Sequence, residues 1–266
     1  MKRALGVLLA VVVATLGVAQ SSYAVAANDF TFVSLHADYY LGADKDGRST
    51  LKTVETLVVN IPASKQGQQI DQTIPKNDDG HPTDLKFVSV TDQNKKAKQF
   101  WGTSSGSNEI LHITVPNKTS GQQTYVVTYT QRDVTTYVAN PGEHEFAWQV
   151  GSAQWRQAIP TVSATIYASS NIEPTLNKRV TCTVGSTSCQ ITEKGNTITA
   201  SAKNVGAGQS MAIMVGFTAG TFRAYEPTLG DHLATSWPII AIVIVCVIII
   251  IVVGVVYYRK KQKGER

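Results

Sequence analysis

The chain has 266 residues, with strongly apolar ends and a polar stretch between them that is rich in Thr, Ser, Gln, Val and Gly. The roughly 200 residues between the ends suffice for a β domain with a sizeable core. The net charge of +5 does not indicate nucleic-acid binding, because much of it lies in a C-terminal basic run opposed only by Glu265: Arg259, Lys260, Lys261, Lys263 and Arg266.

The N-terminus has the pattern of a secretory signal. Lys2 and Arg3 precede an apolar run over residues 4–19, and small residues follow at positions 24–27. This order predicts a signal helix within residues 1–27, with cleavage after Ala26 or Ala27. An uncleaved signal anchor is the alternative, and both interpretations place residue 28 onward outside the membrane.

The central part reads as a series of short strands. Apolar and polar residues alternate over residues 33–41, the Asp46–Gly47 pair predicts a turn, and residues 51–61 return as the second strand of a hairpin. Further strands are predicted at 85–90, 110–115, 125–130, 145–149, 161–168, 180–184, 197–202 and 211–217. Since no sustained helical period appears, the fold class is all-β, and we expect a sandwich-like domain over residues 28–223.

Two patterns resemble catalytic or metal motifs. Residues 102–106 (GTSSG) match the nucleophile-elbow spacing, but a predicted strand follows them instead of a helix, which favours a hairpin loop. Asp44 and Asp46 resemble a calcium loop, yet Gly42 and Thr53 occupy positions where an EF-hand needs acids. A plain turn is favoured, with a weak non-EF calcium site as the alternative.

The histidines give no metal-ligand spacing, and we expect no cofactor. His144 is the one flanked by two acids, Glu143 and Glu145. On a strand those acids would point to the opposite side from His144, so we interpret this segment as an exposed edge.

Cys182 and Cys189 lie seven residues apart around a Gly/Ser/Thr turn. An exported chain meets oxidising conditions, so the spacing predicts a disulfide across a hairpin. Two free thiols are the alternative, and no neighbouring Cys or His pair supports a metal site.

Aromatic residues offer the candidate ligand contacts. Trp148, Trp155 and Tyr167 could form a platform for sugar rings, although a sandwich core is the more common place for Trp. Arg156 directly follows Trp155 and could add a polar contact. We therefore name Trp155 and Arg156 as candidate ligand-contact residues.

The C-terminus predicts a membrane anchor. Residues 239–256 are almost entirely Ile, Val and Ala, and as a helix they would be roughly 27 Å long, close to the bilayer's hydrocarbon thickness. With Trp237 and Tyr258 at the interfaces, the predicted span covers residues 237–258, after a linker at 224–236. The basic tail at 259–266 places the C-terminus in the cytoplasm, and no Leu-Pro-x-Thr-Gly sorting motif precedes the span.

The order of these features resembles the outer domain of the YciQ-like family of predicted bacterial membrane proteins, a domain of unknown function. The resemblance covers about residues 30–223, and its most specific segments are 121–129 (GQQTYVVTY), 146–151 (FAWQVG), 180–185 (VTCTVG) and 206–210 (GAGQS). It implies a β-sandwich outside the membrane on an anchor, and it implies no catalytic residues.

These features predict a single-pass cell-membrane protein with a non-enzymatic binding or scaffolding module outside. Its expected partners are the lipid bilayer and either another envelope protein or a glycan, not nucleic acid. The alternative is an envelope hydrolase whose site forms only on folding, which would need a concave pocket with two or more titratable side chains.

Overall fold

The computed structural model describes residues 30–63 and 69–226, and almost all of its regular structure is β. The strands are β1 (Thr31–Ala43), β2 (Ser49–Ile61), β3 (Gln69–Pro75), β4 (Asn77–Asp78), β5 (His81–Pro82), β6 (Lys86–Thr91), β7 (Phe100–Ser105), β8 (Asn108–Thr114), β9 (Gly121–Arg132), β10 (Thr136–Val138), β11 (Glu143–Val150), β12 (Ile159–Ala168), β13 (Leu176–Val184), β14 (Thr187–Ser188), β15 (Gln190–Lys194), β16 (Thr197–Val205) and β17 (Met211–Thr218). A single 3₁₀ turn, Glu173–Thr175, completes the regular elements of the described residues.

The predicted signal and membrane span lie outside the described residues. Within the described ranges, no helix has the length and apolar character needed to cross a bilayer. The all-β prediction for the domain between them is confirmed.

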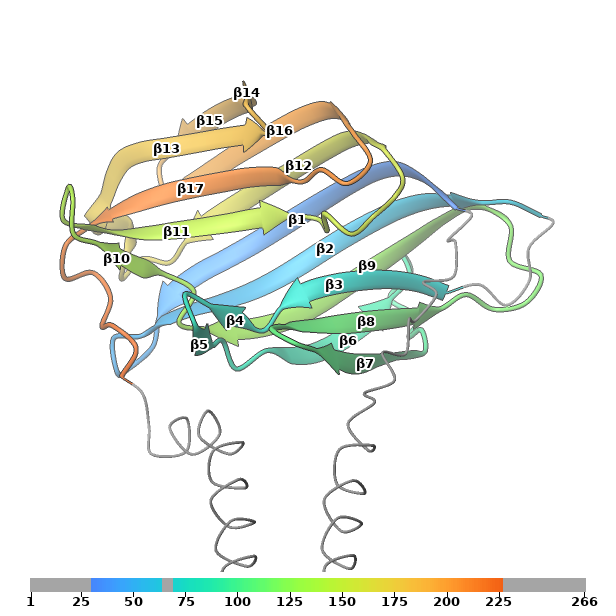
Figure 1. The fold of residues 1–266 in the computed structure, drawn as a ribbon, viewed down its shortest axis with the longest axis horizontal. Helices are drawn as coiled ribbons and strands as arrows, with labels where there is room; N and C mark the ends of the chain where they lie inside the picture. The colour runs from blue at the N-terminus through green and yellow to red at the C-terminus, as the bar shows by residue number, and fades with distance from the viewer. Residues whose placement is uncertain (1–29, 64–68, 227–266) are drawn as a thin grey trace, which may run out of the picture.

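A seven-stranded sheet in the order β15-β16-β12-β1-β2-β9-β6 forms the back layer (Figure 1). The predicted hairpin is present as β1 and β2, which pair antiparallel, with Asp46–Gly47 in their turn. The sequence did not predict the parallel pairing of β1 with β12, which joins strands more than a hundred residues apart.

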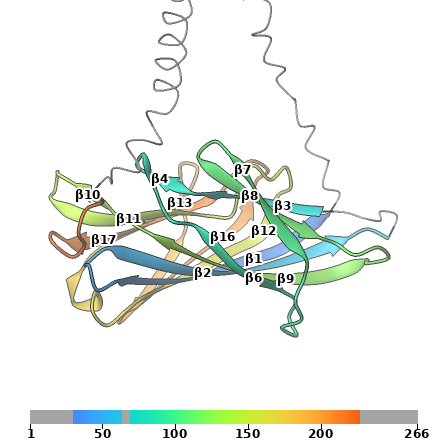
Figure 2. The ribbon, with the colours of Figure 1, turned by 90° about the horizontal axis from the view of Figure 1, so that it is seen from below.

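Two smaller sheets pack against the same face of this layer (Figures 1 and 2). One is five-stranded, in the order β10-β11-β17-β13-β14, and the other is three-stranded, in the order β3-β8-β7. Contacts place them: Tyr39 of β1 meets Phe146 of β11, and Gln72 of β3 bonds Glu55 of β2. The second layer of the expected sandwich is therefore divided in two.

Alternation along the strands produces the core. On β1, Leu35, Ala37, Tyr39 and Leu41 are buried against the second layer, while Tyr40 points to the other face and is 45% exposed. Burying one face of each strand in this way fixes the register, since a one-residue slip would turn the apolar side chains toward water.

Candidate functional site

The predicted disulfide between Cys182 and Cys189 is confirmed. Cys182 lies on β13 and Cys189 directly follows β14, so the bond closes a short hairpin. The backbone N–H of Cys189 also donates to the Cys182 carbonyl oxygen at 3.0 Å.

The predicted aromatic platform is not assembled. Trp148 and Trp155 are buried in the core, whereas Tyr167 lies on the opposite face of the seven-stranded sheet and stacks on Tyr40. The Trp155 ring packs on Phe32, and its Nε1 donates to the Asp71 carbonyl oxygen at 2.7 Å. Trp155 thus ties its loop to β3. Arg156 is exposed beside it, and ligand contact at Trp155 and Arg156 stays a prediction.

The nucleophile-elbow pattern at residues 102–106 falls on a hairpin, as the sequence predicted. β7 and β8 pair antiparallel around Gly106 and Ser107, and β8 is a strand rather than the helix an elbow requires. Ser104 Oγ donates to Glu109 Oε2 at 2.6 Å and accepts from Lys76 Nζ at 2.9 Å, but the strand–turn–helix of a nucleophile elbow is not present in this segment.

The interpretation of residues 143–145 as an exposed edge is wrong. β11 lies between β10 and β17, and Glu143 and His144 are both buried. The Arg179 guanidinium bonds both Glu143 and Glu145, and burial lowers the pKa of His144. Glu143, Glu145 and Arg179 therefore form an ion-pair network on the five-stranded sheet.

A groove of about 300 Å³ opens where the three-stranded sheet meets the five-stranded sheet. Its walls come from β3, the β4 strand and β8 on one side, and from β11 and the loop after it on the other. The described lining includes Trp148, and it carries four side-chain amides and one carboxylate: Asn77, Asn108, Gln149, Gln154 and Asp78. This volume lies at the lower end of the usual range for small-ligand sites.

The loop at residues 151–155 shapes one wall of the groove. Gly151 has a φ of +84°, and a Cβ at this position would lie 2.9 Å from Leu35 Cδ2 and 3.1 Å from Trp155 Cζ3. Only glycine fits here without displacing either neighbour. The close approach lets the Trp155 ring pack beside Gly151 while its Nε1 bonds Asp71 of β3.

The charge of the groove is low and negative. Its described lining contains no Lys, Arg or His, and Asp78 is its only ionisable residue. Burial raises the pKa of Asp78, His81 lowers it, and Asp79 raises it further, with a net upward shift. The site therefore suits a ligand that forms hydrogen bonds and carries little or no negative charge.

A row of side chains on the outer face of the three-stranded sheet continues this surface. Trp101, His112 and Asp71 are register partners across β7, β8 and β3. The Trp101 ring stacks on His112 with centroids 5.1 Å apart, yet Trp101 remains 48% exposed. His112 Nδ1 lies 2.8 Å from Asp71 Oδ1, and Nε2 lies 3.1 Å from Thr103 Oγ1.

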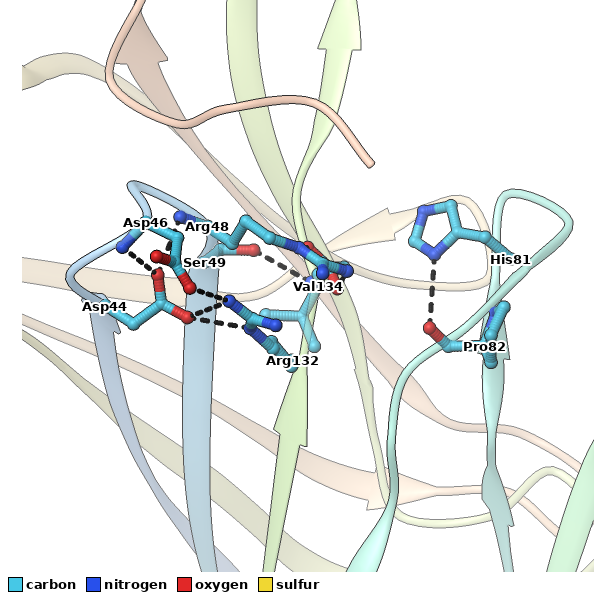
Figure 3. Close-up of polar contacts among 9 residues, drawn as sticks. Asp44, Asp46, Arg48, Ser49, His81, Pro82, Arg132 and Val134 are labelled. Carbon is cyan, nitrogen blue, oxygen red and sulfur yellow. Dashed lines mark hydrogen bonds and ion pairs between the residues drawn. The ribbon is translucent and has the colours of Figure 1, made fainter. Parts of the chain in front are cut away.

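A second polar cluster lies at the β1–β2 turn of the seven-stranded sheet (Figure 3). Asp44 Oδ1 accepts hydrogen bonds from the backbone N–H groups of Asp46 and Arg48, and Arg132 bonds the carboxylates of both Asp44 and Asp46. Burial opposes ionisation of Asp44, but these hydrogen bonds outweigh it and lower its pKa. The predicted turn is confirmed. The Arg132 guanidinium pairs with the two carboxylates that a calcium ion would need.

This cluster holds the C-terminal end of the described chain. The Tyr225 ring stacks on His81 with centroids 4.6 Å apart, and the Arg48 guanidinium carbon lies 5.3 Å from the same ring. Arg48 in turn is ion-paired with Asp133, and the Arg223 N–H donates to the Gly47 carbonyl oxygen at 2.8 Å. We call this contact of residues 223–226 with Arg48 and His81 the C-terminal clamp.

Residues 36–217 match the family model of the N-terminal domain of DUF2207, described as a predicted membrane protein. The match covers well over half of the chain. The chain belongs to the DUF2207 family. This confirms the resemblance seen in the sequence, and the groove, the Trp101 row and most of the clamp's partners lie inside the matched range.

Solved structures give a weaker likeness to this DUF2207 domain. Leukotriene A4 hydrolase from Saccharomyces cerevisiae matches with a TM-score of 0.46 and 11% identity, covering 71% of this chain and 29% of the hydrolase. An M1 zinc metallopeptidase from Deinococcus radiodurans (TM-score 0.40, 9%, covering 69% and 42%) and a putative protease from Parabacteroides distasonis (0.39, 9%, 71% and 41%) are similar at the same level. This chain spans under half of each, and such TM-scores carry no argument about activity. No curated protein matches in sequence.

One hydrogen-bonded trio in the DUF2207 domain resembles a nucleophile, base and acid. His36 Nδ1 lies 2.8 Å from Ser163 Oγ, and His36 Nε2 lies 3.1 Å from Asp38 Oδ1, all on the outer face of the seven-stranded sheet. Ser163 belongs to a central strand paired on both sides, so its neighbourhood offers no free pair of N–H donors for an oxyanion. The trio is a polar cross-strand contact on an open face.

The sequence pattern predicted neither the groove nor a role for Trp101. The groove combines residues 73–78, 108 and 147–154, and nothing in their local patterns links them. Trp101 was missed because β7 lacks apolar alternation. Residues 102–106, which overlap this strand, were interpreted as a hairpin loop. Among the described residues, no group of three or more His, Cys, Asp or Glu side chains could hold a metal ion.

Proposed function

We propose that this protein is a membrane-anchored, extracytoplasmic binding module whose ligand occupies the groove between β3 and β11. The observation that carries the proposal is the lining of that groove: neutral amides converge with Trp148 around a space of about 300 Å³. Pockets that recognise ligands place a few oriented polar groups on an otherwise apolar lining, and here Pro75, Ala147 and Ala153 supply apolar lining beside the largely buried Trp148.

The same lining favours binding over hydrolysis. The usual hydrolysis of a glycosidic bond needs two carboxyl groups that flank the bond, and the described lining supplies only Asp78. A second hollow, beside the C-terminal clamp, holds Asp46, Arg132 and other charged residues, but these groups pair with one another. A hydrolase therefore has less support than a binding module.

The C-terminal clamp supports the anchored part of the proposal. Residues 223–226 are held against the domain and include the first three residues of the predicted linker at 224–236, which leads to the predicted span at 237–258. A domain fixed at its last residues would keep one orientation relative to the bilayer. Membership of a family of predicted membrane proteins agrees with this arrangement.

Thermal unfolding of the full chain in lipid nanodiscs tests the proposal. The added material would be the polysaccharide, protein and lipid fractions of a bacterial cell envelope, each assayed separately. A groove ligand binds only the folded state, so a saturating fraction should raise the wild-type Tm by about 5 °C.

Gln154→Trp provides the decisive comparison, because Gln154 lines the groove from an exposed loop and a Trp there would fill the space. This variant should show no shift, while Asn94→Trp, in an exposed turn away from the groove, should behave like wild type. An equal shift in wild type and Gln154→Trp, or no shift with any fraction, would overturn the proposal.

A further inference from the structure

We propose that the ligand of the groove is an uncharged glycan, and that one of its sugar rings stacks on Trp101. This inference rests on the proposed function and names the ligand class for that site. It depends on three features of the surface: the exposed aromatic ring, the polar groups beside it, and its continuity with the groove.

The exposed ring is unusual for its residue type. Among the four Trp residues of the sequence, Trp148 and Trp155 are buried, whereas Trp101 keeps nearly half of its surface accessible. His112 covers part of the ring by stacking and holds its plane in place. Exposing a Trp ring to water is unfavourable and contributes little to the stability of the fold. A flat apolar ring that is fixed at the surface therefore indicates a site for a partner.

The neighbouring polar groups suit hydroxyl recognition. Gln69, Asp71, His112 and Thr103 form one chain of hydrogen bonds beside the ring, and the bonds to Asp71 from Gln69 and His112 both end on its Oδ1. Side chains locked by one another present donors and acceptors in fixed directions, which lowers the entropy lost on binding. An apolar plane next to such groups matches a sugar ring, which has apolar C–H faces and a hydroxyl rim.

The row and the groove form one surface. Thr73 follows Asp71 on the same face of β3, and Asn108 lies on the same face of β8 as His112. Both Thr73 and Asn108 line the groove. The three strands of the row span about 10 Å across the sheet, so an extended chain of several units could contact Trp101 and the groove together.

Charge selects the uncharged class of glycan. The described groove lining holds one carboxylate and no cation, and the Trp101 row adds a second carboxylate at Asp71. A polyanionic chain would meet a like charge at Asp78 and, at Asp71, a carboxylate that already pairs with His112, whereas a neutral chain would meet hydrogen-bonding groups at both places.

Titration calorimetry on the full chain in nanodiscs tests this inference. The neutral probes are hexamers of β-linked N-acetylglucosamine, β-linked glucose and α-linked glucose, and the anionic probe is a hyaluronan hexamer, which shares N-acetylglucosamine with the first. At least one neutral probe should bind, and hyaluronan should bind at least about tenfold more weakly.

Variants of Trp101 locate the contact. Trp101→Ala should weaken binding of the neutral probe about tenfold or more, and Trp101→Phe should restore most of it. Tyr137→Ala removes a similarly exposed ring from β10 and should bind like wild type. Unchanged affinity in Trp101→Ala, or equal affinity for hyaluronan, would overturn the inference.

The two proposals can fail separately. If Gln154→Trp abolishes binding while Trp101→Ala does not, the groove binds its ligand without Trp101, so this inference fails and the proposed function stands. If no neutral probe binds although an envelope fraction still raises the wild-type Tm, the ligand belongs to another class. If neither probes nor fractions act, both proposals fail.

Discussion

Glu55 is a carboxyl group in the core, between β2 of the large sheet and β3 of the three-stranded sheet. It is only 2% exposed, and it accepts a hydrogen bond from Tyr129 Oη at 2.9 Å and another from Gln72 Nε2. Burial raises its pKa, although these two hydrogen bonds partly oppose the shift. A buried carboxyl with a raised pKa favours its protonated form in the folded state.

This burial makes the stability of the domain depend on pH. Above the ordinary Glu pKa of 4.5, the unfolded chain releases the proton of Glu55 before the folded chain does, so the free energy of unfolding falls as pH rises toward the raised folded value. Glu55→Gln cannot titrate and should lack this decrease.

Urea unfolding of wild type and Glu55→Gln from pH 4 to pH 8 measures the difference. Glu193→Gln, on the exposed strand β15, is the matched control and should keep the wild-type slope. Parallel pH curves for wild type and Glu55→Gln would show that the buried carboxyl has an ordinary pKa in the folded protein.

The β13–β14 hairpin is small, and it is closed by the Cys182–Cys189 disulfide that the sequence predicted. Its strands share only two register pairs before the disulfide, so few backbone bonds hold it closed. A disulfide that closes a loop of about eight residues contributes roughly 2–3 kcal/mol, mainly by restricting the unfolded chain.

The double variant Cys182→Ala/Cys189→Ala should therefore lose about 2–3 kcal/mol of unfolding free energy in urea. A reducing agent should lower the stability of the wild type by a similar amount and leave the variant unchanged. A variant as stable as oxidised wild type would mean that the bond adds nothing to the fold.

The C-terminal clamp is an element whose stability should be local. Tyr225 contacts His81 and Arg48 in the last described residues, so its loss should release residues 223–226 without unfolding the sheets. We expect Tyr225→Ala to be cleaved by trypsin after Arg223 about tenfold faster than wild type, with a Tm within about 2 °C.

Tyr40→Ala, which removes a half-exposed ring that stacks on Tyr167 on the outer face of the seven-stranded sheet, serves as its control and should be cleaved at the wild-type rate. Equal cleavage of Tyr225→Ala and wild type would show that the clamp does not hold this segment.

The elements were easier to predict from sequence than their arrangement. Strong alternation predicted β1, β2 and β12, because one face of each is buried in the core. β3 and β7 were missed: β7 is mostly exposed and carries Gly, Thr and Ser, which resemble a turn. Asp44 and Asp46 were interpreted correctly as part of a turn, but their partner Arg132 lies 86 residues beyond Asp46 and no local pattern points to it.

The second layer of the molecule is divided into two sheets (Figures 1 and 2). The groove lies where these two sheets meet. A continuous second sheet would leave no gap between β3 and β11. Because sequence patterns give strands and faces but not the lateral position of separate sheets, neither the groove nor its connection to Trp101 could be predicted. Family membership places this architecture among predicted membrane proteins.

We propose that the groove faces outward from the cell and is occupied there. Cysteines introduced at Gln154, in the groove, and at Asn94, in an exposed turn elsewhere, can be labelled with a membrane-impermeant maleimide in intact cells and in the purified full chain. We predict that both are labelled in intact cells, and that labelling at Gln154→Cys relative to Asn94→Cys is slower in cells than in the purified protein. If neither site were labelled before the cells are permeabilised, the groove would not face outward. If the labelling ratio were identical in intact cells and in the purified protein, the groove would not be occupied.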